Sequence, residues 1–573
     1  MERGSDAVAN REGRYGGSRA VLEIGFVAVV ALAVRLVDLG YPPFIDELHH
    51  LLAAGSLLDT GAPTIHDGGA YMRGLLFTYL VAGSIGLFGQ SLEVARLPAV
   101  LSGVLLVCLL FAWLRARVGR VAAWTAALLL CFAPISIYLS QQVRFYSIHG
   151  LVFWLGAFGL YRLLERTDPP LRRLWIGLGS TAAFLVAFHL QITTVIGLGG
   201  VALFVFLVES PRVFGAVRHS RHRWPIAAAT AVVVGLVVVG AATVGAADIL
   251  LDRAARVDFW ALDRAGNPRF YHWLLNDEYS FLYMLFPLAV LLAVANRWKA
   301  GLLFTAVFGV AFVGHSIAAW KAERFLFYAM PAFFAVWGMA AQEMLPWLWD
   351  RLSARGRASL GRVPAGARRA LVGLALLCAL AFAATGPTAY TTTRLIFLQG
   401  GEWSPPPGHT GEWYRGHPDW EAAVPHLSPL VDSVQVVVGE PDMKLVYYLG
   451  DLDYILYAGN LVGLSSRTGP AEMNPEFTAW PKVGRPMLSR PESVEIIMTC
   501  YATGLLVAEE HVWGWRWGVP RETAEFIEGN MRPVDLPEGT GIVAFRWEQP
   551  EPEPAASARC EQLERTRREA PVE

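Results

Sequence analysis

The residues best suited to chemistry lie in the stretch Tyr41-Pro-Pro-Phe-Ile-Asp-Glu-Leu-His-His50, directly after a long apolar run from Val21 to Leu39. Asp46 and Glu47 are therefore adjacent carboxylates at the point where a membrane helix is expected to end. A carboxylate beside a hydrophobic pocket at a membrane surface has its pKa raised by partial desolvation, which suits a general base. We predict that Asp46 accepts a proton from an acceptor hydroxyl and that Glu47 holds a substrate hydroxyl or adjusts the local charge. The alternative is a solvated interface pair.

The two histidines that follow, His49 and His50, are the next candidates in this stretch. Adjacent side chains on a helix diverge, so a metal ion shared by both is not expected. We predict no metal and no cofactor, and we take His49 as a candidate substrate-binding residue.

A second candidate group is Ser140-Gln-Gln-Val-Arg-Phe-Tyr146, at the outer edge of a later apolar run. The planar guanidinium of Arg144 suits a phosphate or carboxylate, although an interface arginine that extends toward water is the alternative. Tyr146 is either a substrate contact or an interface aromatic residue.

A third group is Trp320-Lys-Ala-Glu-Arg-Phe325, which precedes a run containing Pro331. Lys321 and Arg324 are three residues apart and would share one face of a helical turn, and Glu323 could neutralise one of them. Both cations fall on the side of the membrane that the positive-inside rule disfavours, which indicates an anionic partner such as a lipid phosphate.

Two further positions have simpler interpretations. His189 ends one apolar run beside Gln191; a structural role is the more common one for such a histidine, and substrate binding is the alternative. Glu93 and Arg96 are expected to form a local ion pair.

The composition predicts a polytopic membrane protein. Of 573 residues, 54% are hydrophobic and 17% charged, which is too apolar for an ordinary soluble protein. The net charge of −1 gives no reason to expect a nucleic-acid partner. The five cysteines are scattered, so no disulfide framework is expected. The first apolar run lacks an evident small-residue cleavage site and is expected to be a retained anchor.

Eleven apolar runs are long enough to span a membrane. They cover residues 20–39, 95–114, 120–139, 146–163, 173–189, 192–209, 225–245, 280–296, 301–320, 325–347 and 369–386. Lysine and arginine cluster in alternate connections, which we place in the cytoplasm. This orientation requires that Leu75–Phe88, which is short, does not span. The loop over 40–94 and everything after about 387 then lie outside the cell membrane. Residues 246–279 form another external loop that could cover a substrate.

These features divide the chain into five parts. We predict a cytoplasmic tail over 1–19, a membrane module over 20–387, a linker over 388–417, an extracytoplasmic α/β domain over 418–548 and a disordered tail over 549–573. Strand and helix signals alternate in the fourth part, which favours a layered α/β fold. It has no GxGxxG motif and is not expected to bind a nucleotide.

Together, the three motifs resemble the GT-C superfamily of membrane glycosyltransferases. The branch they resemble most holds the protein O-mannosyltransferases and the bacterial aminoarabinose transferases of lipid A (families 39 and 83). The matching features are Asp46-Glu47 after the first span, the turn from Ser140 to Tyr146, and Lys321-Ala-Glu-Arg-Phe325 before Pro331. The resemblance covers about residues 20–347.

The resemblance implies a mainly helical membrane fold and a polyprenyl-phosphate-linked sugar donor. It also implies transfer to a protein, lipid or glycan acceptor with inversion at the anomeric carbon. Asp46 would be the base, and Arg144, Lys321 and Arg324 would hold the donor phosphate. No second external aspartate stands in the turn at Gln141 and Gln142, in contrast to some relatives, so a metal-assisted role is not expected.

Two other classes of function stay open from the sequence. A flippase or transporter of lipid-linked sugars tends to show inverted repeats and polar residues near the bilayer midplane, whereas the polar residues here lie at external edges. A non-catalytic scaffold with a glycan-binding C-terminal domain is the third possibility.

Overall fold

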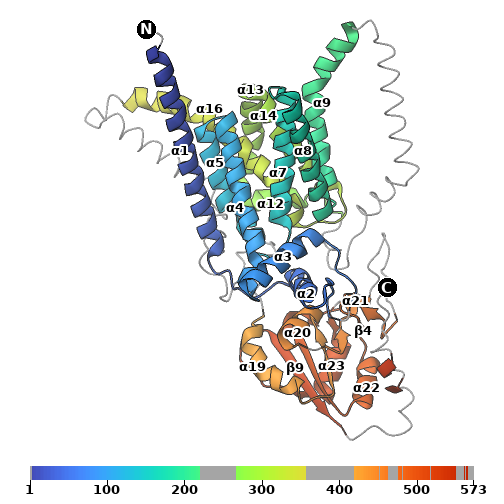
Figure 1. Cartoon of the computed structure of the whole chain (residues 1–573). Helices are drawn as coiled ribbons and strands as arrows, with labels where there is room; N and C mark the ends of the chain where they lie inside the picture. The colour runs from blue at the N-terminus through green and yellow to red at the C-terminus, as the bar shows by residue number, and fades with distance from the viewer. Residues whose placement is uncertain are drawn as a thin grey trace.

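The computed structural model of the chain consists of a bundle of long helices joined to a smaller α/β domain (Figure 1). It describes residues 3–66, 68–219, 266–356, 418–450, 452–461, 475–480, 482–516, 518–549, 560–561 and 563–565.

Apolar sequence runs form the helices of the bundle, as the patterning predicts. The bundle helices are α1 (Arg3–Leu36), α4 (Leu92–Arg117), α5 (Arg120–Phe132), α6 (Pro134–Ser140), α7 (Tyr146–Glu165), α8 (Pro170–Leu190), α9 (Thr194–His219), α12 (Phe270–Met284), α13 (Phe286–Asn296), α14 (Trp298–Ile317), α15 (Glu323–Leu326), the 3₁₀ turn η2 (Phe327–Ala329) and α16 (Met330–Gly356). Within the described residues, six helices are long and apolar enough to cross a membrane, or eight if each of two bent helix pairs counts as one span. The prediction of a mainly helical polytopic protein is confirmed.

The two bent pairs divide single predicted spans. Helices α5 and α6 meet at 61°, where Pro134 lacks the amide hydrogen that would continue the helix. Helices α12 and α13 meet at 52°. Because α12 begins at Phe270, the predicted loop over 246–279 ends earlier than expected. The predicted spans over 225–245 and 369–386 lie outside the described residues, so the total of eleven stays a prediction.

Two shorter helices lie between the bundle and the α/β domain (Figure 1). Helix α2 (Ile45–Thr60) begins directly before Asp46 and ends at Gly61, whose φ of 80° suits glycine. Helix α3 (Leu75–Phe88) has 14 residues, fewer than the roughly 20 needed to cross a bilayer. Both helices belong to the predicted long loop after the first span.

The C-terminal part contains a seven-stranded mixed sheet with the order β3-β4-β2-β1-β5-β9-β8. Strands β4, β2, β1 and β5 are parallel, and β3, β9 and β8 are antiparallel to their neighbours. The sheet strands are β1 (Val436–Glu440), β2 (Tyr454–Leu456), β3 (Ala479–Trp480), β4 (Arg485–Leu488), β5 (Thr503–Glu509), β8 (Arg532–Pro533) and β9 (Ile542–Glu548). A separate pair is formed by β6 (Trp513–Gly514) and β7 (Val519–Pro520), after the 3₁₀ turn η4 (Glu510–Val512). The prediction of an α/β domain is confirmed.

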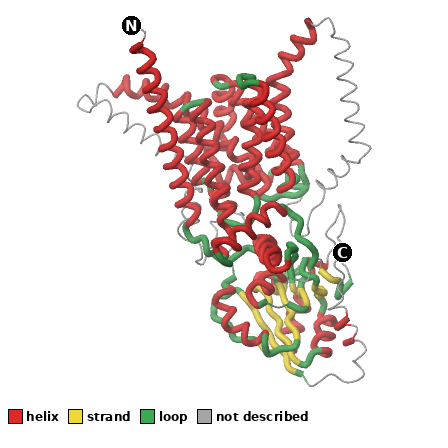
Figure 2. The backbone as a smooth tube through the Cα atoms, in the orientation of Figure 1, coloured by secondary structure: helices red, strands yellow, loops and turns green. Residues whose placement is uncertain are grey.

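Each face of the sheet is covered by helices (Figure 2). One face contacts α22 (Pro491–Cys500) and α23 (Arg521–Asn530) through a core that includes Val438, Leu506 and Ile497. The other face contacts α19 (Trp420–Val431) and α20 (Asp442–Leu449), with the short α21 (Ala458–Leu461) nearby. Residues of α2 belong to this second core, so the membrane part contributes a helix to the layer that covers the sheet.

The structure corrects two expectations about the C-terminal end. Cys500 and Cys560 form a disulfide bond, although no disulfide was expected. The described residues 560–561 and 563–565 are helical, and Leu563 is buried in the domain core. Glu564 accepts a hydrogen bond of 2.8 Å from the Tyr501 hydroxyl. This part of the predicted disordered tail is therefore ordered, because the disulfide and Leu563 attach it to α22.

Candidate active site

Asp46 stands between two arginines that come from separate parts of the bundle. Its Oδ2 lies 3.6 Å from Nη2 of Arg144 and 3.7 Å from Nη2 of Arg324. Arg144 is in the turn between α6 and α7, and Arg324 is in α15. Nη1 of Arg144 also donates to the Asp46 backbone carbonyl at 2.8 Å. The Asp46 side chain is 27% exposed, so it remains accessible to a substrate. The structure thus brings together three of the residues predicted from the sequence.

The charge environment of Asp46 differs from the expectation. Burial raises the pKa of its carboxyl, but the positive charges of Arg144 and Arg324 hold that pKa well below its ordinary value. Partial desolvation alone predicts a raised pKa for Asp46, which is wrong because Arg144 and Arg324 both face this carboxylate. Asp46 is accordingly ionised, as a base must be, while its proton affinity is low for as long as both arginines face it.

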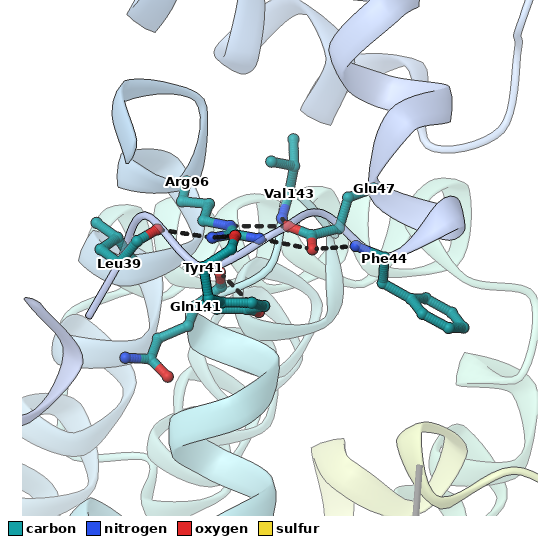
Figure 3. A network of polar contacts seen from close by, with 7 residues as sticks. All are labelled: Leu39, Tyr41, Phe44, Glu47, Arg96, Gln141 and Val143. Atoms are coloured by element: carbon teal, nitrogen blue, oxygen red, sulfur yellow. Dashed lines mark hydrogen bonds and ion pairs between the residues drawn. The ribbon is translucent and has the colours of Figure 1, made fainter. Parts of the chain in front are cut away.

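Glu47 forms a buried network of hydrogen bonds and an ion pair (Figure 3). Its carboxylate accepts two hydrogen bonds from Arg96 of α4, at 2.8 and 2.9 Å. It also accepts the backbone N–H groups of Phe44 at 3.0 Å and Val143 at 2.7 Å. Both charged side chains of the pair are 0% exposed. Glu47 therefore joins the start of α2, helix α4 and the turn that carries Arg144.

Arg96 extends this network to the end of the first membrane helix (Figure 3). Its Nη1 donates to the carbonyls of Leu39 at 2.6 Å and Tyr41 at 2.8 Å, and its guanidinium lies over the Tyr41 ring. The expected local pair of Arg96 with Glu93 is wrong, because Glu47 takes the guanidinium. With no exposed atoms, Glu47 cannot reach a substrate in this structure, so its geometry indicates a positioning role.

Lys321 and Arg324, which the sequence placed on one face, have different partners in the structure. The Lys321 ammonium donates to three backbone carbonyls at the end of α14, those of His315, Ser316 and Ala318. It is 1% exposed and caps the helix, so it does not join Arg324 beside Asp46. Glu323 is buried at the start of α15, with 3% exposure.

The predicted substrate-binding residues lie at different distances from the centre. The Tyr146 hydroxyl lies 3.3 Å from Nη2 of Arg144 and helps to hold that arginine. His49 is buried beside Tyr71, with Nδ1 3.2 Å from the Ile45 carbonyl oxygen. Burial lowers the pKa of His49 to about 3, so this ring is neutral. His189 is exposed and accepts the Leu76 N–H at 3.5 Å, which ties α8 to α3.

Sequence reasoning missed Arg73, which lies between α2 and α3. Its positive charge lowers the pKa of Asp46, and its guanidinium lies 5.7 Å from the centre of the Phe145 ring. The Arg73 side chain is exposed. Arg73 lies in a predicted external loop, on the side of the membrane that the positive-inside rule disfavours for Lys321 and Arg324 as well, so the same signal could have identified it.

No group of three or more His, Cys, Asp or Glu side chains is arranged to hold a metal ion within the part of the chain that the structure describes. The absence of a metal from the reaction stays a prediction.

Comparison with known proteins agrees with this fold. Residues 72–241 match the family model described as dolichyl-phosphate-mannose-protein mannosyltransferase. No curated protein matches the chain.

Several solved structures share the fold. The apo structure of ArnT from Cupriavidus metallidurans is 17% identical with a TM-score of 0.59, and the match covers 93% of this chain and 98% of ArnT. The structure of the same protein bound to undecaprenyl phosphate is 16% identical with a TM-score of 0.58, covering 92% and 97%. The oligosaccharyltransferase AglB from Archaeoglobus fulgidus, in complex with an inhibitory peptide and a dolichol-phosphate, is 15% identical with a TM-score of 0.52, covering 87% and 70%.

The fold therefore defines a class: the chain has the architecture of the GT-C membrane glycosyltransferases. The family model and the ArnT-like fold confirm the resemblance inferred from the sequence motifs.

Proposed function

We propose that this protein is an inverting glycosyltransferase that moves a sugar from a polyprenyl-phosphate donor to an acceptor hydroxyl. The observation that carries the proposal is the placement of the partly exposed Asp46 carboxylate between Arg144 and Arg324. A structural relative is described as bound to undecaprenyl phosphate, and another as bound to a dolichol-phosphate, which supports a lipid-linked phosphate as the ligand of these arginines. The reaction faces the extracytoplasmic side.

The chemistry follows from the charges at the site. Arg144 and Arg324 bind the donor phosphate, and the exposed Arg73 is the third cation available to it. The acceptor oxygen attacks the anomeric carbon from the face opposite the phosphate, the bond from that carbon to the phosphate oxygen breaks, and its electron pair leaves with the phosphate. Asp46 takes the acceptor proton. The phosphate leaves without a proton, so the cations suffice to stabilise it.

Donor binding would also make Asp46 a better base. The two arginines that lower its pKa are the ones proposed to bind the phosphate, whose negative charge offsets theirs. The base therefore becomes stronger only when a donor is present. Lys321 is left out of the phosphate site because three carbonyls already take its ammonium group.

The test is the Asp46→Asn variant, which preserves shape and removes the base. We expect sugar transfer to fall by about 10²-fold or more, while binding of undecaprenyl phosphate is retained. The matched control is Asp59→Asn, an exposed position near the end of the same helix, which should transfer normally. Transfer by Asp46→Asn at the rate of the control would refute the assignment of the base. A flippase or transporter would carry lipid-linked sugar across the membrane equally well in both variants. It would transfer no sugar to an acceptor in either.

A further inference from the structure

Helix α2 has two sides with different partners. Asp46 and the Glu47 network face the bundle, whereas Leu48 and Ala53, both 0% exposed, belong to the core of the C-terminal domain. In that core they share a cluster with Leu445 of α20 and Ile455 of β2. Figure 1 shows α2 lying next to α20. The helix that carries the proposed base is therefore also part of the layer that covers the sheet.

The loop after α2 makes a second contact with the domain. Gly68 packs against the turn between β3 and β4 so closely that a Cβ at position 68 would overlap the carbonyl oxygen of Lys482 and lie 2.8 Å from the amide nitrogen of Val483. Beside it, Nη2 of Arg485 lies 3.4 Å from Nε2 of His66. Glycine is required here by close approach of two backbones, not by its φ angle.

The charges of the buried network also act on the domain. Burial raises the pKa of Tyr447 in α20, and the charges of Arg96 and Glu47 also act on it, which places this side chain near their ion pair. From the β3–β4 turn, the positive charge of Lys482 acts on His49. The domain thus lies close to both ends of the segment that holds Asp46.

We propose that the C-terminal domain positions Asp46 in the active site by docking on α2 and on the loop at Gly68. Leu48, Ala53 and Gly68 are then positioning residues. This inference rests on the proposed function and deepens it: it assigns the domain a role in turnover, in place of a role in recruiting the acceptor.

The origin of the site residues makes the inference testable. Arg144 and Arg324 come from the bundle, but Asp46 comes from a helix held by both parts. Weaker docking should displace the base relative to Arg144 and Arg324, which the bundle still carries. The expected signature is a lower kcat with unchanged donor affinity. A domain that only recruited the acceptor would instead control the KM for the acceptor.

The experiment uses the full-length protein with Gly68→Ala and, as control, Gly55→Ala. A Cβ at Gly55, in the same helix as Asp46, would meet nothing within 4 Å. A misplacement of about 1 Å can cost about 10²-fold in rate, so we expect kcat of Gly68→Ala to fall by about 10- to 100-fold and that of Gly55→Ala to stay unchanged. Turnover is measured with polyprenyl-phosphate mannose and a titrated membrane fraction as acceptor, and donor affinity with undecaprenyl phosphate.

A second variant, Ala53→Leu, widens the same interface from α2 without altering the sheet. It should lower kcat in the same way while undecaprenyl phosphate still binds, which also reports that the bundle is folded. Wild-type kcat in both Gly68→Ala and Ala53→Leu would overturn the inference, as would a raised acceptor KM at unchanged kcat. If the wild-type chain transfers sugar from no polyprenyl-phosphate donor, the proposed function itself fails, and this inference with it.

Discussion

At the scale of single residues, two adjacent carboxylates have opposite environments. Successive side chains on a helix point about 100° apart, so Asp46 faces Arg144 and Arg324 while Glu47 faces the interior. The Asp46 side chain is 27% exposed and that of Glu47 is 0% exposed. Glu47 is part of the site only because it holds the Arg144 turn against α2 through Val143.

Replacing Glu47 by glutamine should therefore lower the stability of the folded protein, because Glu47 has a structural role and no direct role in the reaction. The change leaves the buried Arg96 guanidinium without a counter-charge, which typically costs about 3–5 kcal/mol. We expect the free energy of unfolding, measured by denaturant titration in detergent, to fall by about that amount.

The matched control for this change is Glu165→Gln, which breaks an exposed pair. Arg117 and Glu165 are 31% and 20% exposed, so their pair should contribute less than about 1 kcal/mol. Equal losses in the two variants would contradict the positioning role of Glu47.

At the scale of elements, a short segment between α14 and α16 separates two neighbouring cations. Lys321 turns back to the carbonyls that α14 leaves without intrahelical partners, and Arg324 turns toward Asp46 from the next short helix. The three-residue spacing places both on one face only if they share a regular helix. α15 starts at Glu323, so they do not.

The variants Lys321→Leu and Arg324→Leu should separate these two roles. Loss of the Lys321 ammonium leaves buried carbonyls unsatisfied and should lower stability by about 1–3 kcal/mol, with the dissociation constant for undecaprenyl phosphate unchanged. Loss of Arg324 should weaken that binding about tenfold or more, since a hydrogen bond to a charged group is worth about 1.5–3 kcal/mol. If Lys321→Leu weakened the binding of undecaprenyl phosphate as much as Arg324→Leu, Lys321 would have to be counted among the residues that bind the phosphate.

At the scale of the whole molecule, the disulfide supports the orientation inferred from the basic connections. Disulfides form and persist in oxidising compartments, and Cys500–Cys560 lies in the domain that the positive-inside rule places outside. The same side of the molecule carries α2 and the site, so one orientation accounts for the domain, the site and the cations near it.

This orientation predicts different behaviour of the cysteines. In protein isolated without reductant, Cys500 and Cys560 should resist thiol labelling after denaturation, while the free Cys108 and Cys131 react. Cys500→Ser should destabilise the domain by about 2–4 kcal/mol, and Cys108→Ser, in a membrane helix, is the control. Labelling of Cys500 in such a preparation would contradict the extracytoplasmic assignment.

Much of this architecture is determined by local sequence. Apolar runs of membrane length specify the helices wherever the structure describes them, because the bilayer leaves backbone groups no other partners. Residue patterning also predicts that strands and helices alternate over 418–548, and the structure confirms this alternation. The sequence identifies Asp46, Arg144 and Arg324 because charged residues at the outer ends of apolar runs are costly to place there and therefore indicate a function.

The tertiary structure decided what each of those residues faces. The pairing of Glu47 with Arg96, the capping role of Lys321, the approach of Arg73 and the low pKa of Asp46 all depend on segments that are far apart in the chain. The packing of α2 into the core of the C-terminal domain likewise cannot be predicted from hydrophobic periodicity. Local sequence patterns predict which side chains are buried. Only the packing of distant segments determines which charged groups lie next to them.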